Sequence, residues 1–499
     1  MSYSKKDFAE QELNILRKSV DNIQQNIGKK TLSDPNVKHI IEIVEDFLRK
    51  KKLICYGGTA INNILPEQDQ FYNKDVELPD YDFFSPRALE DAKELADIYY
   101  KAGFEEVEAK AGVHPGTFKV FVNFIPVADV TQLVKEIYGN LKREAIKIDG
   151  ILYCPPNYLR MSMYLELSRP KGDVSRWEKV LKRLTLLNKH YPLKSQNCKN
   201  IEVQRLFSSY DKVNSKDLFF IVRDILINNG VIFFGALAHK LYTKYNKKNN
   251  IATIPDFDVL STNPKRTSEI LKERLIDYNF KNVRVIKKPG IGEIIAPHYE
   301  VRVGKNTIAF IYKPLACHSY NTHILKDKTV KIASIDTMLS FYLAFLYSNR
   351  PYYEDDRILC MAQYLFNVQQ KNRLKQQGLL KRFGIECYGE QETIEKMRAE
   401  KTNKFKELKN DRNSKEYQKY FLKYVPGEKK STKKITTKKN KSKSSNKKTT
   451  KKPTKKPTKK TTKKPTKKPT KKPTKKTTKK TTKKTSNKKT TKNKVPFTD

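Results

Sequence analysis

The sequence is poor in the features that mark zinc-binding, disulfide-rich, membrane and secreted proteins. Its six cysteines are scattered over 499 residues without a Cys-x-x-Cys pair, so neither a zinc site nor a disulfide framework is expected, and a reducing compartment is favoured. The longest apolar runs, such as residues 336–347, are too short to cross a bilayer. The amino terminus is polar and charged, which argues against a secretory signal. We therefore expect a soluble intracellular protein with no membrane partner.

Acidic residues are almost absent from the C-terminal segment. Residues 429–499 contain 32 lysines and one acidic residue, so they carry +31 of the total charge of +48 and leave +17 for residues 1–428. The Lys-Lys-Pro-Thr pattern has almost no apolar content and predicts a disordered cationic tail. Such a tail raises affinity for RNA through counterion release, although a solubilising or targeting role explains it as well. The basic remainder also favours a polyanionic partner.

The first part of the chain alternates expected helices and strands, which predicts an α/β or α+β sheet domain. Apolar residues recur at helical spacing over residues 37–48, and an apolar strand is expected at 53–56. A helix that begins with proline is expected over residues 86–101. Residues 117–130 are rich in β-branched and aromatic residues, which predicts one long buried strand.

The second half of the chain repeats the first at offsets of 176 to 178 residues. The matching landmarks are Gly57 with Gly235, Asp80 with Asp256, Ser162 with Ser340, and Tyr164 with Tyr342. We infer a duplicated unit of about 180 residues, each a sheet followed by helices. The expected divisions are an N-terminal helical segment (1–35), a first unit (36–200), a second unit (201–385), a C-terminal helical segment (386–428) and the tail (429–499).

Two glycines and three aspartates form the candidate site. Gly57 and Gly58 follow a strand, where the backbone can approach a phosphate and the next helix offers free amides, with a plain tight turn as the alternative. Asp80 and Asp82 are two apart on a strand and project from one face, an arrangement that suits divalent cations or a solvated edge strand. Asp129 ends the next buried strand or caps its turn. If the strands are adjacent, three carboxylates can hold two metal ions.

These motifs together resemble a known family. The segments YGGTAIN (56–62), LPDYDFFSP (78–86) and VNFIPVADVTQL (122–133) are similar to the nucleotidyltransferase superfamily of DNA polymerase β. Within it, they resemble the poly(A) polymerase catalytic subunits of poxviruses and giant DNA viruses. The resemblance covers most of residues 40–350 and implies two tandem nucleotidyltransferase-like sheet domains with helical segments.

The resemblance implies a template-independent poly(A) polymerase, which transfers AMP from ATP to the 3′ end of mRNA and releases pyrophosphate. It assigns Asp80, Asp82 and Asp129 to catalysis and to two Mg²⁺ or Mn²⁺ ions, and Gly57, Gly58 and Thr59 to the nucleotide. The alternatives are a terminal nucleotidyltransferase that uses UTP or DNA ends, and a nucleic-acid-binding protein that has lost its catalysis.

The second copy is expected to be a pseudo-site without catalysis. Its matching residues are Gly235, Asp256 and Asp258, with Ala236 in place of the second glycine. The third aspartate is expected to be replaced by Ala316 or Cys317, and the nearby His318 is a weak candidate for a substitute ligand. Two carboxylates beside a degraded phosphate loop make a poor two-metal site, so we expect this copy to be structural, to line an RNA path or to form a subunit interface.

Further contacts to the triphosphate or the primer are expected from residues 168–184. The candidate cations are Lys171, Arg176 and Lys179; Tyr158, Arg160 and the single tryptophan Trp177 are candidates for RNA, with a core position as the alternative for Trp177. Besides RNA and ATP, the expected partner is a second copy of the chain or a separate processivity subunit. The resemblance places the protein in the host cytoplasm at viral replication sites, with packaging in the virion as a further expectation.

Overall fold

The computed structural model describes residues 5–73, 75–195, 198, 204–205, 212–245, 254–325 and 327–427. Contacts divide the chain into two units, Met1–Lys430 and Ser431–Asp499, and the fold described here belongs to the first. The expected disordered tail over residues 429–499 lies outside the described residues. Among the helices described, none combines the length and the apolar character that crossing a bilayer requires.

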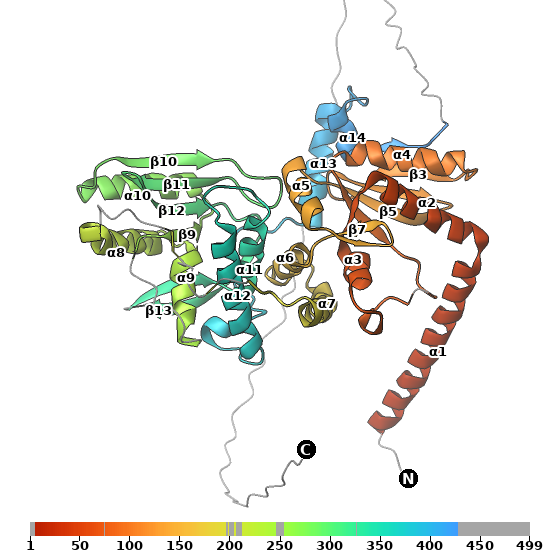
Figure 1. The fold of residues 1–499 in the computed structure, drawn as a ribbon, viewed down its shortest axis with the longest axis horizontal. Helices are drawn as coiled ribbons and strands as arrows, with labels where there is room; N and C mark the ends of the chain where they lie inside the picture. The colour runs from red at the N-terminus through yellow and green to blue at the C-terminus, as the bar shows by residue number, and fades with distance from the viewer. Residues whose placement is uncertain are drawn as a thin grey trace, which may run out of the picture. The chain divides into compact units, whose positions relative to one another are not determined.

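The first half of the fold is an α/β unit on an eight-stranded sheet (Figure 1). Its helices are α1 (Lys5–Ser33), α2 (Pro35–Lys51), α3 (Gly57–Ile64), α4 (Ala88–Lys101), α5 (Lys135–Glu144), α6 (Pro156–Leu167) and α7 (Trp177–His190). Its strands are β1 (Ile54–Cys55), β2 (Tyr81–Ser85), β3 (Val107–Ala111), β4 (Thr117–Val122), β5 (Ile125–Gln132), β6 (Ile146–Ile148) and β7 (Ile151–Tyr153). The strand order is β16-β3-β4-β5-β2-β1-β7-β6.

The second half builds another eight-stranded sheet, with the order β10-β11-β12-β9-β8-β14-β13-β15. Its helices are α8 (Lys212–Asn228), α9 (Gly235–Tyr242), α10 (Pro264–Asp277), α11 (Ile335–Phe345) and α12 (Asp355–Lys371), followed by α13 (Ile394–Leu408) and α14 (Lys415–Phe421). Its strands are β8 (Ile232–Phe234), β9 (Phe257–Leu260), β10 (Val283–Lys288), β11 (His298–Val303), β12 (Asn306–Tyr312), β13 (His318–Leu325), β14 (Lys328–Ala333) and β15 (Cys387–Tyr388). Strand β16 (Lys423–Tyr424), near the C-terminus, belongs to the first sheet.

The two sheets have the same topology, which supports the inferred duplication. Strands β3-β4-β5-β2-β1-β7-β6 of the first sheet correspond in order to β10-β11-β12-β9-β8-β14-β13 of the second. In each sheet two pairs are parallel: β2 with β5 and β1 with β7 in the first, β9 with β12 and β8 with β14 in the second. The expected C-terminal helical segment also contributes an edge strand to each sheet, because β16 pairs with β3 and β15 pairs with β13.

Helices α6 and α11 pack against each other and join the two halves into one core. All residues of α11 are buried, and Ser334 caps its first turn by accepting a hydrogen bond from the amide of Thr337. Asn140 of the first half donates a hydrogen bond to the Tyr347 carbonyl of the second half at 2.7 Å. The two matching Ser and Tyr landmarks of the sequence therefore lie on the helices that hold the halves together.

Helix α2 forms for the reasons that the sequence indicates. Asp34 accepts a hydrogen bond from the amide of Asn36, and Pro35 occupies the first helical position. The apolar face buries Val37, Ile40, Val44, Phe47 and Leu48. Lys52 then adopts a left-handed conformation and ends the helix. The predicted helix over residues 37–48 is confirmed, and β1 follows it as expected.

The prediction of one long strand over residues 117–130 is wrong, because this segment is the hairpin of β4 and β5. Asn123 (φ 49°) and Phe124 (φ 66°) form a left-handed turn between the two strands. Phe124 is 81% exposed, although its apolar character fits the expected strand. The hairpin places Lys119 directly opposite Asp129.

The expectation of unpaired cysteines is also wrong. Disulfides join Cys198 to Cys360 and Cys317 to Cys387, whereas Cys55 and Cys154 are free and buried. The bonded partners are 162 and 70 residues apart in the sequence. Their spacing therefore contains no local signal, and only the fold brings them together.

Candidate active site

The turn from β1 into α3 must begin with glycine. Gly57 has φ +74°, and a Cβ atom there would lie 2.6 Å from Oδ2 of Asp82. The amide of Tyr56 donates a hydrogen bond to the Asp82 carbonyl at 2.9 Å, which fixes this turn against β2. The hydroxyl of Thr59 donates to the Asp80 carbonyl at 2.6 Å. The start of α3 is therefore held beside both aspartates of the Asp-x-Asp motif.

The parallel pairing of β2 with β5 places Asp82 directly opposite Asp129. Asp80 immediately precedes β2, two residues before Asp82. The pKa of Asp82 is raised to about 7, first by burial and then by the negative charges of Asp80 and Asp129. The sequence prediction that these three carboxylates share one site is thus supported by register and by electrostatics.

Lys119 is the cation that partly balances this negative charge. It projects from β4, opposite Asp129, and its Nζ lies 2.5 Å from Oδ2 of Asp129. The Lys119 side chain is 39% exposed, so it can leave the carboxylate for water. A single strand over residues 117–130, as the sequence predicts, would not bring Lys119 opposite Asp129, so this pair was not expected.

The donor chemistry of the site fits hard divalent cations such as Mg²⁺ or Mn²⁺. In the part of the chain that the structure describes, no three Asp, Glu, His or Cys side chains are gathered closely enough to surround a metal ion as they stand. The fit rests instead on the crowded carboxylates, because a cation would stabilise the ionised form of Asp82 that burial and its neighbours oppose. Asp80, Asp82 and Asp129 are the residues that would hold it.

Arg183 and Tyr72 lie against Gly58 and were not anticipated from the sequence. A Cβ atom at Gly58 would overlap the Tyr72 hydroxyl and lie 2.9 Å from a terminal nitrogen of Arg183. The guanidinium donates to the Tyr72 hydroxyl at 2.6 Å and lies over the ring of Phe71 at 4.8 Å. Tyr72, Lys179 and Arg183 line a hollow of about 380 Å³ beside this turn. A cation on α7 therefore faces the glycine turn.

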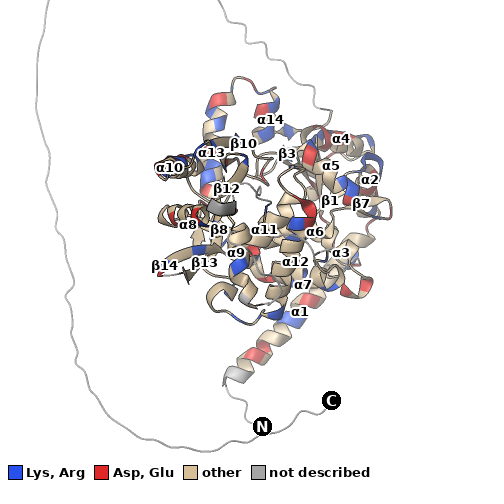
Figure 2. Cartoon of the chain, turned by 60° about the vertical axis from the view of Figure 1, so that its left-hand side comes forward, with Lys and Arg blue, Asp and Glu red and all other residues tan. Residues whose placement is uncertain are grey.

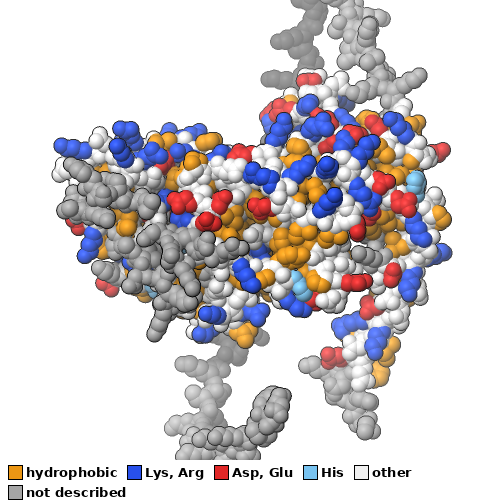
Figure 3. All heavy atoms as spheres, in the orientation of Figure 1, with side chains coloured by type: hydrophobic (Ala, Val, Ile, Leu, Met, Phe, Trp, Pro, Cys, Tyr) orange, Lys and Arg blue, Asp and Glu red, His pale blue; other side chains and the backbone are white. Residues whose placement is uncertain are grey.

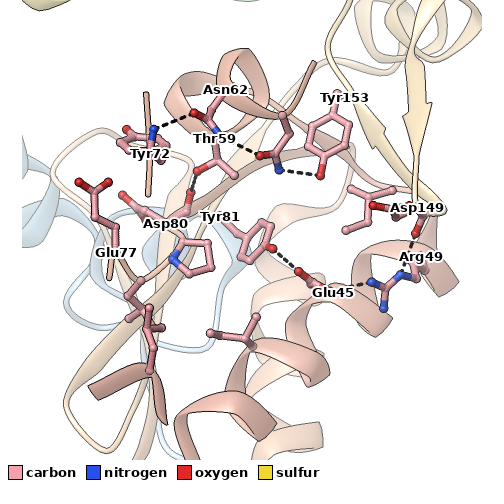
Figure 4. Close-up of a pocket in the computed structure, with 16 residues that line it drawn as sticks. Glu45, Arg49, Thr59, Asn62, Tyr72, Glu77, Asp80, Tyr81, Asp149 and Tyr153 are labelled. Atoms are coloured by element: carbon pink, nitrogen blue, oxygen red, sulfur yellow. Dashed lines mark hydrogen bonds and ion pairs between the residues drawn. The ribbon is translucent and has the colours of Figure 1, made fainter. Parts of the chain in front are cut away.

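A second cavity, of about 340 Å³, lies behind the Asp-x-Asp motif (Figure 4). Tyr81 lines it and donates to Glu45 at 2.5 Å, and Glu45 in turn pairs with Arg49 at 2.6 Å. Asn62 of α3 accepts hydrogen bonds from the amides of Phe71 and Tyr72, both at 2.8 Å. These bonds fasten the first residue of β2 to α2 and the loop before β2 to α3, so the cavity wall positions Asp80.

The remaining predicted cations differ in their placement. Arg176 pairs with Glu166 at 3.2 Å, and its positive charge acts to lower the pKa of Asp82, so it lies near the site. Lys171 is exposed. The indole of Trp177 donates to the Glu166 carbonyl at 3.1 Å and packs near Phe383, which favours the core alternative.

The candidates Tyr158 and Arg160 are wrong as RNA contacts because both are buried, at 4% and 0% exposure. Arg160 donates to Asn188 at 2.8 Å and also to Asn157 and the Tyr191 carbonyl. Its guanidinium therefore holds α6 to the end of α7, a structural role that its sequence context does not reveal.

The second copy repeats the geometry of the first but fills it with an arginine. Gly235 has φ +73°, and a Cβ atom there would overlap Oδ2 of Asp258. Arg205 donates to Asp256 through its side chain, and its other terminal nitrogen lies 2.5 Å from Oδ1 of Asp258. Burial lowers the pKa of Arg205, but the two carboxylates more than offset this, so its pKa is raised. The guanidinium of Arg205 neutralises both carboxylates of the second copy. Among the described residues, no arginine makes such a pair with both Asp80 and Asp82 of the first copy.

The residue opposite Asp258 is Phe310, so the placement of Ala316 or Cys317 at the third position is wrong. Phe310 lies within β12, the strand that corresponds to β5 of the first sheet. The conclusion that the second copy has no third aspartate still holds. His318 begins β13, which β8 and β14 separate from β9, and both its ring nitrogens are buried, so it does not replace the missing ligand.

This topology, with a glycine turn, an Asp-x-Asp motif and a third aspartate across a parallel pair, defines a nucleotidyltransferase-like fold. Residues 42–173 match the family model of the poly(A) polymerase catalytic subunit. The chain is also similar to the Megavirus polyadenylate synthase structure, with a TM-score of 0.71 and 20% identity over 85% of this chain and 87% of that one. At this identity the likeness concerns the fold.

Curated relatives extend the family match. The chain is 34% identical over 186 residues to a protein named as a poly(A) polymerase catalytic subunit of African swine fever virus (strain Badajoz 1971 Vero-adapted), covering 36% of this chain and 39% of that protein. It is 26% identical over 246 residues to the protein of the same name from Acanthamoeba polyphaga mimivirus, and the match covers 45% of this chain and 41% of that protein. The chain thus matches about two fifths of the length of these relatives. The resemblance that the sequence motifs indicated is confirmed over this region.

We predict that the raised pKa of Asp82 makes the metal-free protein less stable as pH rises. The folded state holds a proton on Asp82 up to about pH 7, whereas the unfolded chain releases it near pH 4, so the free energy of unfolding falls between these values. Asp82→Asn removes this loss and should exceed wild type by about 1–3 kcal/mol at pH 7.5 in EDTA, but not at pH 4. Denaturant unfolding at several pH values measures the difference.

Magnesium provides the control for this prediction. It should raise the melting temperature of wild type at pH 7.5 and leave Asp82→Asn unchanged, because the variant lacks a charged ligand. A stability difference that does not vary with pH, together with equal responses to magnesium, would contradict the cation site.

We predict that Arg205 stabilises the second copy by neutralising its two aspartates. Arg205→Met leaves Asp256 and Asp258 buried without their partner and should lower the free energy of unfolding by about 3 kcal/mol. Adding Asp256→Asn and Asp258→Asn to this variant should recover most of the loss. Chemical denaturation of the three proteins measures both steps, and an unchanged stability in Arg205→Met would show that the buried ion pairs do not form.

Proposed function

We propose that this chain is a template-independent polynucleotide adenylyltransferase that extends the 3′ end of RNA with AMP from ATP. The observation that carries the proposal is the register of Asp82 and Asp129 beside the Gly57 turn, within the segment that matches the poly(A) polymerase family. In the proposed reaction the 3′-hydroxyl oxygen forms a bond to the α-phosphorus of ATP. The bond from that phosphorus to the bridging oxygen breaks, pyrophosphate leaves, and the hydroxyl proton passes to water.

Asp80, Asp82 and Asp129 supply the oxygen ligands for divalent cations in this proposal. A divalent cation held by these residues would supply activation of a hydroxyl nucleophile and neutralisation of charge on the phosphates. Lys119 keeps Asp129 paired while the site is free, and its partly exposed position lets it withdraw when another cation neutralises the carboxylate. Lys119 therefore holds the Asp129 carboxylate in position before a cation binds.

The glycine turn and Arg183 suit the triphosphate. At Gly57 and Gly58 the backbone has no side chain in front of the amides that begin α3, so phosphate oxygens can approach them. Arg183 lies beside this turn with its guanidinium oriented by Tyr72. Lys179 lines the same hollow. The two cations and the amides that begin α3 therefore lie on one side of the carboxylates. A metal-bound triphosphate requires positive groups in this arrangement.

Basic side chains outside the site support RNA as the polyanionic substrate. The net charge of residues 1–428 is +17. Lysine and arginine residues are spread over helices of both halves, including α9, α13 and α14 (Figure 2). Such a distribution gives an affinity for the RNA backbone that falls with salt and does not depend on sequence.

We predict long extension of a labelled RNA primer with ATP and Mg²⁺ or Mn²⁺, and little extension with the other nucleoside triphosphates. Asp82→Asn and Asp129→Asn should each reduce the rate at least about 100-fold, because both aspartates act on charge in the transition state. Gel analysis of the product lengths measures the rate.

The control is the triple variant Arg205→Met, Asp256→Asn, Asp258→Asn, which removes the three charges that meet at the pseudo-site of the second copy and should keep full extension. Extension with UTP instead of ATP, or on DNA ends, would overturn the nucleotide or primer specificity. RNA binding without extension under any condition would instead support a protein that has lost catalysis.

We predict that Arg183 contributes to ATP binding. Arg183→Ala removes one charge-assisted contact and should raise the KM for ATP about 10-fold or more, with a smaller effect on kcat. Arg183→Lys should recover part of this loss. Lys189→Ala is the matched control, because it removes a cation of the same helix that pairs with Asp69. Equal KM values in Arg183→Ala and Lys189→Ala would exclude a contact between Arg183 and the nucleotide.

A further inference from the structure

A row of charged side chains crosses the first sheet from the candidate active site to the edge of the sheet. The strand registers pair Asp82 with Asp129 and Asp129 with Lys119. They continue by pairing Lys119 with Lys110 and Lys110 with Lys423 of β16. Residues directly opposite each other on neighbouring strands project from the same face of a sheet. Lys119, Lys110 and Lys423, here termed the lysine row, therefore extend the line of the carboxylates over three further strands.

The lysine row lies on the solvent face of the sheet. The residues beside it in β3, β4 and β5 are 0% exposed and pack in the core: Ala109, Val120 and Val130. Because side chains alternate along a strand, the row faces away from that core. The side chains of Lys119 and Lys110 are 39% and 43% exposed, and Lys423 is exposed as well. A ligand in solution can therefore reach all three lysines.

Three lysines opposite one another suit a ligand that carries several negative charges, because like charges on paired strands repel. An edge lysine protects a sheet against unwanted pairing, but only Lys423 belongs to an edge strand. Lys110 pairs with Glu108 at 2.5 Å, and both side chains are partly exposed, so the pair is weak and a phosphate can replace the carboxylate. Lys119 becomes available in the same way when it leaves Asp129. A chain of phosphates therefore fits the row as a whole.

The surface beyond the row is also basic. Residues 394–424, which form α13, α14 and β16, contain ten lysines and arginines and five acidic residues, a net charge of +5. Figure 3 shows lysine and arginine side chains gathered over the part of the surface where α13 and α14 lie in Figure 1. The chain continues from β16, which ends at Tyr424, into the lysine-rich sequence that begins at residue 429. Positive charge is therefore not confined to the row, as a long polyanion requires.

We propose that the lysine row binds the backbone phosphates of the 3′-terminal nucleotides of the RNA. The inference rests on the proposed function for the identity of this strand. The strand order places the row on the β4 side of the carboxylates and the Gly57 turn, which follows β1, on the other side. RNA and ATP then approach the carboxylates from opposite sides, as transfer of AMP to the 3′-hydroxyl requires.

The length of the row sets how much RNA it contacts. Three strand spacings of about 4.8 Å separate Asp129 from Lys423, which gives about 14 Å. A stacked strand has one phosphate for about 3.4 Å of its axis, so the row accommodates about four nucleotides. Nucleotides farther from the 3′ end lie beyond β16.

The row is tested with the full chain and a short RNA primer of about six nucleotides. The double variant Lys110→Ala, Lys423→Ala removes two phosphate contacts and should raise the KM for this primer about 10-fold, with the KM for ATP unchanged. Steady-state rates of AMP incorporation measure both constants. Because both side chains are open to solvent, an unchanged melting temperature shows that the fold is intact.

The matched control is the double variant Lys147→Ala, Lys272→Ala. It removes the same charge from β6, at the opposite edge of the sheet, and from α10 of the second half. Both lysines are exposed, and this variant should keep both KM values. Equal KM values for the primer in the row variant and in this control would overturn the proposal.

Cross-linking separates the lysine row from the proposed function, because it needs no catalysis. An RNA with 4-thiouridine about three nucleotides before its 3′ end should cross-link on irradiation to peptides of β3 or β16, whereas a label about twenty nucleotides away should not reach these strands. Cross-links of the near label only outside these strands would overturn the row. If wild type extends no RNA while the near label still reaches β3 or β16, the adenylyltransferase function fails and the row is supported.

Discussion

The parallel pairing of β2 with β5 is the constraint on which the site depends. It places the Asp82 carboxylate opposite that of Asp129, with Asp80 two residues away and a glycine turn in contact. Burial first, and then this crowding of like charges, raises the pKa of Asp82, so the arrangement is unfavourable in a folded protein. A fold that keeps these carboxylates together must neutralise their negative charge. Whether the neutralising cation is a side chain or a metal ion decides what the site can do.

The two halves of the chain meet this constraint in different ways. In the first, Lys119 pairs with one of three carboxylates and remains partly exposed, so an incoming cation can replace it. In the second, Arg205, whose side chain is only 12% exposed, bridges Asp256 and Asp258, and Phe310 lies where a third carboxylate would be. One copy therefore keeps an exchangeable charge, whereas the other has a permanent internal counterion. Duplication of the fold preserved the backbone of both sites, including the glycine with positive φ.

Sequence reasoning found the backbone of the site because its signals are local. Asp80 and Asp82 share one short motif, and the glycine turn follows a recognisable strand. It missed Lys119, Arg183 and Arg205, because each contacts a residue that is distant along the chain or on a strand whose hairpin turn was not recognised. The cysteine pairs were missed for the same reason. The fold class and the duplication were predictable from periodic patterns, whereas the partners of charged side chains depend on tertiary structure.

The central claim is that a metal ion can replace Lys119 in the first copy, whereas Arg205 keeps metal ions out of the second. Anomalous diffraction from crystals that contain Mn²⁺ and a non-hydrolysable ATP analogue tests this claim most directly. The account predicts Mn²⁺ peaks beside Asp80, Asp82 and Asp129, with Lys119 turned away from Asp129. It predicts none between Asp256 and Asp258, where Arg205 remains. A manganese peak at the second pair, or an unchanged Lys119 pair with no peak at the first site, would contradict it.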